Sequence, residues 1–255
     1  MITINGLFLD YDGTISPLEI SREQSKVLPH IEAFLKVITK FIPIGVITTK
    51  DLQFIVPRTT FAHAWATIAG FETKVGNRIS LSQEAETALP YLSGALEYVK
   101  ENGYAGLVIE EKKNHKGQVM AFCVDWRQAG DQKTARTAAE RILQYCKKQP
   151  LKVIEYPKKP YFDVFPCQID KGAALNNLKQ KLGISGGIIY MGDSATDNAA
   201  FKAADVSIGV STSKEPTDLE CQYWIKFDDI AFFLSSLFKK NFNFSPDLPG
   251  IRVRG

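Results

Sequence analysis

Residues 7–14 read LFLDYDGT, and this stretch decides the fold because an apolar strand ends there at two carboxylates. The apolar run begins near Ile2 and is typical of a short buried strand. Side chains alternate in direction along a strand, so Asp10 and Asp12 point to the same side. The glycine that follows them allows a tight turn. The two acids therefore mark the carboxyl end of a strand, which is the edge where open α/β sheets bind ligands.

Two interpretations of this stretch are open at this point. An Asp-Gly turn after a strand is common and needs no chemistry. Two acids at a ligand-binding edge are instead typical of a site for a hard cation, with one acid available for covalent chemistry. A short motif by itself fits both interpretations, so the rest of the chain has to decide.

The composition is that of an ordinary globular protein with enough apolar residues for a core. The 255 residues are 45% hydrophobic and 23% charged, with a formal net charge of +3. This length fits one large domain or two modest ones. The basic residues form no long runs, which argues against a nucleic-acid partner. The cysteines are scattered without a C-x-x-C pair, which disfavours a disulfide or a zinc site.

Targeting signals are absent from the sequence pattern. No apolar run is long enough to span a membrane, and no signal-peptide pattern follows Met1. We therefore expect a cytoplasmic protein, a monomer or a small homo-oligomer, with neither a membrane nor a nucleic acid as partner.

The first part of the chain alternates between strand and helix. A helix is expected from a capping box at Ser21 to about Thr39, and then a strand over residues 42–47 that ends at Thr48. A strand–helix–strand order predicts parallel strands in a right-handed unit, which brings Thr48 to the same sheet edge as Asp10. The threonine hydroxyl either caps the next helix or binds a phosphate oxygen, and a helix N-terminus is compatible with both roles.

The pattern changes near Lys74. From there the chain reads helix, hairpin, helix, hairpin, which predicts a small α+β module with an antiparallel sheet. The alternating pattern returns after Pro166. We therefore expect a core domain made of residues 1–73 and 166–255, and an inserted domain over residues 74–165.

Two further chain segments reach the edge where the first strand ends. Lys171 is at the start of a predicted helix. A predicted apolar strand is followed by residues 192–197, which read GDSATD. Mg²⁺ prefers oxygen ligands and is usually held by one or two carboxylates plus a substrate phosphate. Asp10 and Asp193 can supply these carboxylates, with the main-chain carbonyl of Asp12 as a third ligand. The sequence therefore predicts a magnesium site at this edge.

This set of residues has the chemistry of phosphoryl transfer. Asp10 can attack phosphorus to give an aspartyl-phosphate, while a metal ion reduces the repulsion between the two anions. Lys171, the Thr48 hydroxyl and backbone N–H groups can stabilise charge on the phosphoryl oxygens. Asp12 can protonate the leaving oxygen and then deprotonate water, a role that typically contributes ~10²–10⁴-fold.

The four segments together resemble the haloacid dehalogenase superfamily. D-x-D-G-T, a strand ending in Thr, a Lys that opens a helix, and G-D-x-x-x-D stand in that family's order. The resemblance implies a Rossmann-like α/β core with a parallel sheet and a Mg²⁺-dependent enzyme. Its nucleophile would be Asp10 and its acid/base Asp12, and an acid at position 12 is similar to the phosphatase and phosphomutase branches rather than the ATPases.

The resemblance also implies the remaining ligands of the core site. The phosphate ligands would be Thr48, Thr49 and Lys171. The metal ligands would be Asp10, Asp12, Asp193 and Asp197. For Asp197 two roles stay open, either a direct contact with the metal or the orientation of Lys171.

The inserted domain resembles the family's type 2 cap. Its helix–hairpin–helix–hairpin order is similar to the cap of trehalose-6-phosphate phosphatases and related sugar-phosphate phosphatases. Residues 109–112 and 125–127 resemble that group's E-x-K and H-Y-R elements. The implied sugar ligands in the cap are Glu110, Lys112, Arg127 and Asp163. A solvated hairpin with ordinary cross-strand ion pairs is the alternative interpretation of these residues.

The chain departs from that group's pattern at three places. Asp125 replaces a His, Ser194 replaces a second Asp, and residues 48–50 read TTK where the group has Ser-Gly-Arg. A lysine is a point charge and does not copy the bidentate fork of an arginine. We expect the core chemistry to survive these changes, and the sugar specificity stays open.

The function expected from the sequence is Mg²⁺-dependent hydrolysis of a sugar phosphate. Trehalose 6-phosphate is the first candidate, as a step of trehalose biosynthesis. The alternatives are mannosyl-3-phosphoglycerate, sucrose phosphate and a phosphomannomutase-like reaction. An inactive binding module is a further alternative, although such a fold is expected to lose Asp10 or Lys171 and this chain keeps both.

Overall fold

The computed structural model describes residues 1–18, 20, 22–156, 159–212 and 214–254. They form two compact units. The first consists of Met1–Thr49, Gln53–Ser80 and Asp170–Gly255, and the second of Lys50–Leu52 and Leu81–Ile169. The domain boundaries expected from the sequence, near residues 74 and 165, stay a prediction. Each unit is described by itself below.

The first unit is built on a large, mostly parallel sheet. The strand order is β14-β12-β11-β10-β1-β2-β3-β4-β5, and β13 pairs with β1. The strands are β1 (Ile2–Leu9), β2 (Ile44–Ile47), β3 (Ala64–Thr67), β4 (Glu72–Val75), β5 (Arg78–Leu81), β10 (Gly187–Gly192), β11 (Val206–Ser211), β12 (Tyr223–Lys226), β13 (Asn243–Phe244) and β14 (Arg252–Val253). The pairs from β3 through β2, β1, β10 and β11 to β12 are parallel, which confirms the predicted parallel core.

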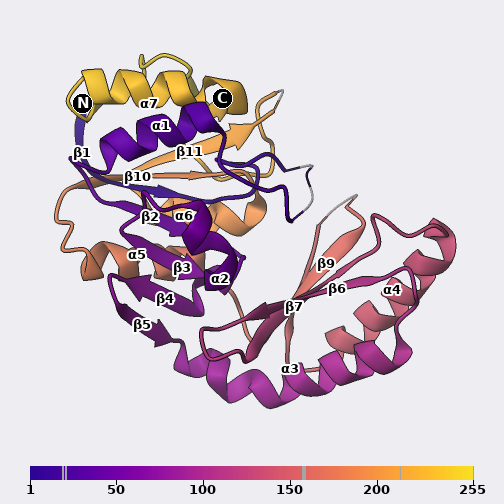
Figure 1. The fold of residues 1–255 in the computed structure, drawn as a ribbon. Helices are drawn as coiled ribbons and strands as arrows, with labels where there is room; N and C mark the ends of the chain where they lie inside the picture. The colour runs from indigo at the N-terminus through magenta and orange to yellow at the C-terminus, as the bar shows by residue number, and fades with distance from the viewer. Residues whose placement is uncertain (19, 21, 157–158, 213, 255) are drawn as a thin grey trace. The chain divides into compact units, whose positions relative to one another are not determined.

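Helices cover both faces of this sheet, with α1 and α7 on one face and α5 and α6 on the other (Figure 1). The helices are α1 (Pro29–Ile38), α2 (Leu52–Ile55), α5 (Lys171–Lys181), α6 (Asn198–Ala203) and α7 (Ile230–Lys239), and short 3₁₀ turns include η3 (Ala195–Asp197). Because both faces are covered, the central strands read as continuous apolar runs rather than alternating ones. Leu7, Phe8 and Leu9 of β1 are accordingly fully buried.

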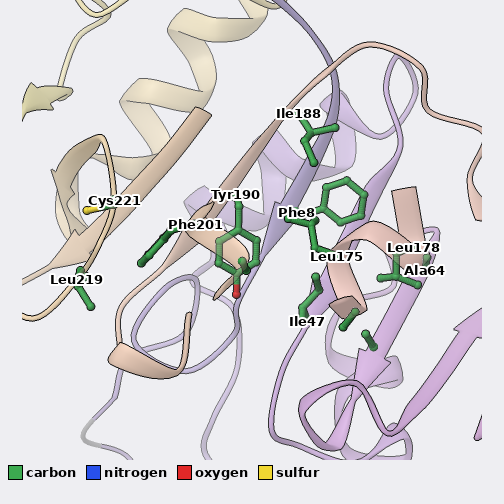
Figure 2. Packing of buried hydrophobic residues seen from close by; sticks show 13 residues of the cluster. Phe8, Ile47, Ala64, Leu175, Leu178, Ile188, Tyr190, Phe201, Leu219 and Cys221 are labelled. Carbon is green, nitrogen blue, oxygen red and sulfur yellow. The ribbon is translucent and has the colours of Figure 1, made fainter. Parts of the chain in front are cut away.

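One part of the core lies around the centre of the sheet. Phe8 from β1, Tyr190 from β10 and Leu175 from α5 belong to one buried cluster there (Figure 2). Phe201 from α6 packs the edge of its ring against Tyr190, with the ring centroids 5.5 Å apart. This packing fixes β10 and β1 beside each other, so the strand ends that carry Asp10 and Asp193 are held in register.

The first helix begins later than the sequence predicted. The helix α1 starts at Pro29, and Leu28 before it is extended with ψ at 135°. A proline restricts the residue before it to extended conformations, which prevents the helix from running further back. Ser21, the expected capping residue, lies outside the described residues.

The chain after residue 240 pairs with the sheet through two short strands. Its strand β13 pairs antiparallel with β1, and β14 pairs antiparallel with β12. Phe244 is 2% exposed, so the segment contributes a side chain to the core. Strands of two residues are too short to leave a periodic signal in the sequence.

The second unit is the predicted α+β insert. Its antiparallel sheet has the order β6-β7-β9-β8. The elements are α3 (Gln83–Asn102), β6 (Val108–Lys113), β7 (Val119–Asp125), α4 (Gln132–Lys147), β8 (Lys152–Glu155) and β9 (Tyr161–Phe165). The expected turn around Pro157 and Lys158 lies outside the described residues.

Pro90 lies inside α3, which runs through it without a break. The proline ring lies on the exposed side, while Ala85 before it and Leu92 after it are buried. Packing of both halves therefore compensates for the backbone hydrogen bond that a proline removes. No helix among the described parts of the chain is both long and apolar enough to span a bilayer.

Candidate active site

Three carboxylates meet at the carboxyl ends of neighbouring strands in the first unit. Asp10 follows β1, Asp193 follows β10, and Asp197 closes the short turn η3. Each offers one carboxylate oxygen, and these atoms all lie within 4.8 Å of one another. The parallel pairing of β1 with β10 brings the first two together, as the alternation of strand and helix in the sequence predicted.

Lys171 reaches this group from the start of α5. Asp170 caps that helix by accepting a hydrogen bond from the Ala173 N–H at 2.8 Å. The Lys171 side chain is almost completely buried, with Nζ 3.1 Å from Asp10 Oδ1 and 2.7 Å from Asp197 Oδ1. Burial opposes the charge of the ammonium, but the two carboxylates outweigh it and raise the pKa of Lys171. These contacts therefore favour the charged form of the lysine.

Burial also governs the acids. It raises the pKa of Asp10 to about 7, although the Lys171 ammonium opposes the shift. Burial, followed by the charges of Asp10 and Asp197, raises the pKa of Asp193 well above its usual range. If all three were ionised, the carboxylates beside one ammonium would leave an excess of negative charge in a buried place. Oxygen donors with uncompensated charge fit a hard divalent cation, so this arrangement fits the predicted magnesium site.

Gly13 lets the turn after β1 approach Asp193. Its backbone has φ at +75°, a region that residues with a Cβ rarely adopt. A Cβ on Gly13 would also lie only 2.0 Å from Asp193 Oδ2. The sequence predicted the tight turn, but it carried no signal that the glycine also makes room for the carboxylate of the other strand.

Asp197 has hydrogen-bond donors at both of its oxygens. Oδ1 accepts from Lys171 Nζ at 2.7 Å and from the Tyr190 hydroxyl at 2.6 Å. Oδ2 accepts from the Asp193 and Ser194 N–H groups at 3.2 and 3.0 Å, and from Ser194 Oγ at 3.1 Å. These contacts fit the orientation of Lys171, and Asp197 also belongs to the group of acids that could hold a metal, so its role stays a prediction.

Ser194 shows what one departure from the sequence pattern does. Its hydroxyl donates to Asp197 at 3.1 Å, which an aspartate at this position would not do. The main chain also passes close to the carboxylate here, since a Cβ on Gly192 would lie 2.5 Å from Asp197 Cγ. The serine therefore helps to hold the Asp197 side chain in place without adding a further acid.

The remaining residues predicted for the core site lie at the ends of the expected elements. Thr48 follows β2 and is buried, with its N–H donating to the Ala66 carbonyl at 2.9 Å. Thr49 and Asp12 are partly exposed, and Asp12 pairs with Ser16 in an isolated bridge. Their roles toward phosphate, metal and proton transfer stay predictions.

Two of the residues predicted for sugar binding pair with each other inside the second unit. Lys112 Nζ lies 2.7 Å from Asp163 Oδ1, and both side chains are buried. The Tyr156 hydroxyl donates to the other oxygen of Asp163 at 2.8 Å. Burial opposes the charge of Lys112, but Asp163 outweighs it and raises the lysine's pKa. The sheet thus holds a compact charged cluster, made of Lys112, Asp163 and Tyr156.

The other two predicted sugar ligands also have charged partners. Arg127 Nε donates to Asp125 Oδ2 at 2.7 Å, and its guanidinium lies 5.0 Å from the centre of the Tyr161 ring. Glu110 lies 3.8 Å from Nζ of Lys50, a residue that clusters with the same unit. Ion pairs within the unit agree with the alternative interpretation of these residues, and their part in sugar binding stays a prediction.

Tyr190 is a residue that the sequence reasoning missed. It stands in the apolar run of β10, and it was not among the residues predicted for the site. The available signal was chemical, because a tyrosine inside a buried strand needs a partner for its hydroxyl. The structure provides that partner as Asp197, and burial together with the Asp197 charge raises the pKa of Tyr190, so its hydroxyl stays a donor.

Comparison with known proteins identifies the family. The family model of the haloacid dehalogenase-like hydrolases matches residues 84–230, which is more than half of the chain. The chain belongs to this family. The family membership expected from the four motifs is thereby confirmed. Three residues of the site described above, Lys171, Asp193 and Asp197, lie within the matched part of this hydrolase.

Curated relatives of this hydrolase include several proteins named trehalose-phosphate phosphatase. It is 26% identical over 267 residues to "Probable trehalose-phosphate phosphatase G" of Arabidopsis thaliana, covering 91% of this chain and 68% of the relative. It is also 26% identical over 245 residues to "Trehalose-phosphate phosphatase B" of the same plant, covering 85% of this chain and 61% of that one. The chain thus spans about two thirds of the length of these relatives, and the relationship is distant.

Solved structures show the same fold. A trehalose-6-phosphate phosphatase related protein aligns with a TM-score of 0.69 at 19% identity, over 90% of this chain and 95% of that one. The C-terminal domain of the Candida albicans trehalose-6-phosphate phosphatase aligns with a TM-score of 0.72 at 17% identity, over 91% of each chain. A sugar phosphatase of HAD subclass IIB aligns with a TM-score of 0.61 at 14% identity, over 94% of this chain and all of that one. The parallel sheet with an antiparallel insert is therefore the fold of subclass IIB.

Proposed function

We propose that this hydrolase is a Mg²⁺-dependent phosphatase of a sugar phosphate that works through an aspartyl-phosphate, with trehalose 6-phosphate as the first candidate substrate. The observation that carries the proposal is the position of Lys171, whose Nζ lies 3.1 Å from Asp10 Oδ1 beside the carboxylate of Asp193. The names of the curated relatives support the choice of substrate.

In this proposal Asp10 is the nucleophile. One of its carboxylate oxygens forms a bond to phosphorus as the bond from phosphorus to the sugar oxygen breaks. Water then attacks the same phosphorus and releases inorganic phosphate, which restores the carboxylate. Burial destabilises the ionised Asp10, so the Lys171 ammonium has to hold it in the reactive form.

Lys171 and Thr48 act on the phosphoryl group. Both side chains are buried, so their N–H and O–H dipoles act where water does not weaken them. As charge spreads over the phosphoryl oxygens, the ammonium of Lys171 stabilises it, and removal of one such group typically costs roughly 10²–10³ in kcat. The Thr48 hydroxyl and the start of the following helix would add donors on the other side.

Asp12 is the proposed acid and base. It stands two residues after the nucleophile and is partly exposed, so water can reach it. In the first step its proton goes to the leaving sugar oxygen, and in the second step it takes a proton from the attacking water. The order of these two transfers restores Asp12 to its starting state after each turnover.

The carboxylates of Asp10 and Asp193 and the main-chain carbonyl of Asp12 would hold the Mg²⁺. When bound, the ion would neutralise the acids and lower the repulsion between the nucleophile and the substrate phosphate. Asp197 already accepts hydrogen bonds from Lys171 and Tyr190, so in this proposal it orients the lysine and does not bind the metal. If Asp193→Asn weakened Mg²⁺ binding and Asp197→Asn changed it little, the result would support the assignment of Asp193 to the metal and of Asp197 to Lys171.

A panel of sugar phosphates tests the proposal. We expect the protein to release phosphate from trehalose 6-phosphate in the presence of Mg²⁺, and chelation with EDTA to abolish the release. The panel includes sucrose 6-phosphate, mannosyl-3-phosphoglycerate and mannose 6-phosphate, because a preference for any of them would replace the candidate substrate and keep the mechanism. Asp10→Asn is expected to reduce turnover by at least about 10⁴-fold, as removal of a covalent nucleophile does. Normal turnover by Asp10→Asn would overturn the mechanism.

A further inference from the structure

One hydroxyl in the core donates a hydrogen bond to Asp197, the carboxylate that also binds Lys171. Tyr190 is fully buried in β10, and its hydroxyl donates to Asp197 Oδ1 at 2.6 Å. Lys171 Nζ donates to the same oxygen at 2.7 Å. The two donors therefore share one carboxylate oxygen. A change in the position of one donor is expected to change the hydrogen bond of the other.

The position of the tyrosine is fixed by the strand and by its neighbours. Its backbone lies between Phe8 of β1 and Ser207 of β11 in the ladder of the sheet. Phe201 packs edge-on against its ring at an interplanar angle of 72° (Figure 2). A buried ring held in this way presents its hydroxyl at a constant place, and a constant donor is able to fix the carboxylate that it binds.

The balance between two carboxylates decides where the lysine lies. Lys171 Nζ is closer to Asp197, at 2.7 Å, than to Asp10, at 3.1 Å. A carboxylate oxygen that already accepts a hydrogen bond attracts a second donor less strongly. Without the tyrosine hydroxyl, Asp197 Oδ1 would keep Lys171 as its remaining donor among the hydrogen bonds described, and the ammonium would move away from Asp10.

We propose that Tyr190 is a positioning residue, whose hydroxyl restrains Asp197 and so keeps the Lys171 ammonium on Asp10. This inference rests on the proposed function, in which Lys171 acts on the phosphoryl group. Among the hydrogen bonds described, the Tyr190 hydroxyl has its partner in Asp197. Its effect on the reaction passes through Asp197 alone, which makes it separable from a role in packing.

Tyr190→Phe tests the proposal because it removes the hydroxyl and keeps the ring. Phe201→Leu is the matched control, since it loosens the packing around the same ring and leaves the hydroxyl in place. We expect kcat to fall about tenfold in Tyr190→Phe, the scale of a lost hydrogen bond to a charged group, and less than about twofold in Phe201→Leu. An equal fall in both variants at equal loss of thermal stability would reduce Tyr190 to a packing residue and overturn the proposal.

A double-mutant cycle tests the route through Asp197. In an Asp197→Asn background the hydroxyl has no charged partner to restrain, so Tyr190→Phe is expected to change kcat less than about twofold further. A full tenfold loss in that background would show that the tyrosine acts by another route, and it would contradict the proposal.

A measurement without turnover separates this inference from the proposed function. In the metal-free protein, the ¹⁵Nζ resonance of Lys171, assigned by its absence from Lys171→Met, is expected to shift in Tyr190→Phe and to stay in place in Phe201→Leu. An unchanged resonance in Tyr190→Phe overturns the inference whether or not the protein is a phosphatase. A wild-type protein that releases no phosphate from the panel, together with a shifted resonance, overturns the proposed function and leaves the coupling of Tyr190 to Lys171 established.

Discussion

At the scale of single residues, the site depends on charges that water does not screen. Asp10 and Lys171 are both buried, and the lysine keeps its charge because two carboxylates lie within 3.1 Å of it. The same burial raises the pKa of Asp10 to about 7, so the acid is poised between its two forms near neutrality. A nucleophile in this state depends on its neighbours for ionisation, and each neighbour is a point where a single substitution acts.

Gly13→Ala is expected to damage the site more than the fold. The new Cβ would overlap Asp193 Oδ2, at 2.0 Å, and the backbone would hold an unfavourable positive φ. We expect phosphate release to fall at least about tenfold, since a carboxylate of the metal site has to move, in addition to a loss of ~1–2 kcal/mol in the free energy of unfolding. Steady-state kinetics measure the rate of phosphate release, and thermal unfolding of the same preparation measures the loss of stability.

Gly117→Ala is the control for Gly13→Ala. Gly117 has φ at +81°, yet a Cβ there would meet nothing within 4 Å. The control therefore carries the backbone strain without the overlap, and it should lose stability while keeping its turnover. If the two variants lost activity equally, the close approach of Gly13 to Asp193 would not matter for the reaction.

The sequence indicated most of these residues because their chemistry is local. Two acids after an apolar strand, or a lysine at the start of a helix, can be recognised from neighbours along the chain. Tyr190 could not be recognised in this way, because its partner Asp197 is defined only when the turn after β10 folds back on the strand. The pairing of Lys112 with Asp163 was equally hidden, since it joins strands that are not adjacent in the sheet.

At the scale of elements, long periodic segments were predictable and their ends were not. The strand that begins near Ile2, the strand over residues 42–47 and the strand before residues 192–197 are present as β1, β2 and β10, whereas the pair β4 and β5 at the sheet edge was not predicted. The predicted start of α1 was wrong because Pro29 fixes it, and β13 and β14 could not be predicted because strands of two residues show no period. Both are decided by single residues or by long-range pairing rather than by periodicity.

We expect the charged cluster of Lys112, Asp163 and Tyr156 to contribute to the free energy of unfolding of the second unit. Lys112→Met removes the cation and leaves Asp163 buried beside the Tyr156 hydroxyl alone. We expect a loss of about 3 kcal/mol in the free energy of unfolding, because an unpaired buried charge is costly. Urea denaturation followed by circular dichroism measures it.

The double variant Lys112→Met with Asp163→Asn is the control for the cluster. It removes both charges and keeps a hydrogen-bonding partner for Tyr156. It should recover a large part of the loss, because a buried pair replaced as a whole costs less than a pair that is broken. Equal destabilisation of the single and double variants would mean that the ion pair is not what makes Lys112 important.

At the scale of the whole molecule, the stability of the metal-free protein should depend on pH through the site. The raised pKa of Asp10, about 7, means that the native state binds more protons than the unfolded state between about pH 4 and pH 7. The contribution of Asp10 to stability is therefore greatest at low pH and is lost as the pH rises through 7. Asp193, with a raised pKa of the same origin, acts in the same direction.

Mg²⁺ should reverse this loss. Ligand carboxylates have to be ionised, so the ion binds better at high pH and stabilises the native state in proportion to its binding. In thermal unfolding, we expect Mg²⁺ to raise Tm by several degrees at pH 7.5 and by much less at pH 5.5. In Asp193→Asn the metal should raise Tm little at either pH. A Tm increase of equal size at both pH values would contradict the assignment of the acids to the metal.

The central claim is that Asp10 carries the phosphoryl group during turnover. The most direct measurement is to quench the protein with acid during hydrolysis of a sugar phosphate that it turns over and to analyse its peptides by mass spectrometry. The account predicts a phosphoryl group on the peptide that contains Asp10, absent from Asp10→Asn and from protein treated with EDTA. Rapid release of phosphate with no phosphorylated peptide at any quench time, or a phosphoryl group on another residue, would contradict it.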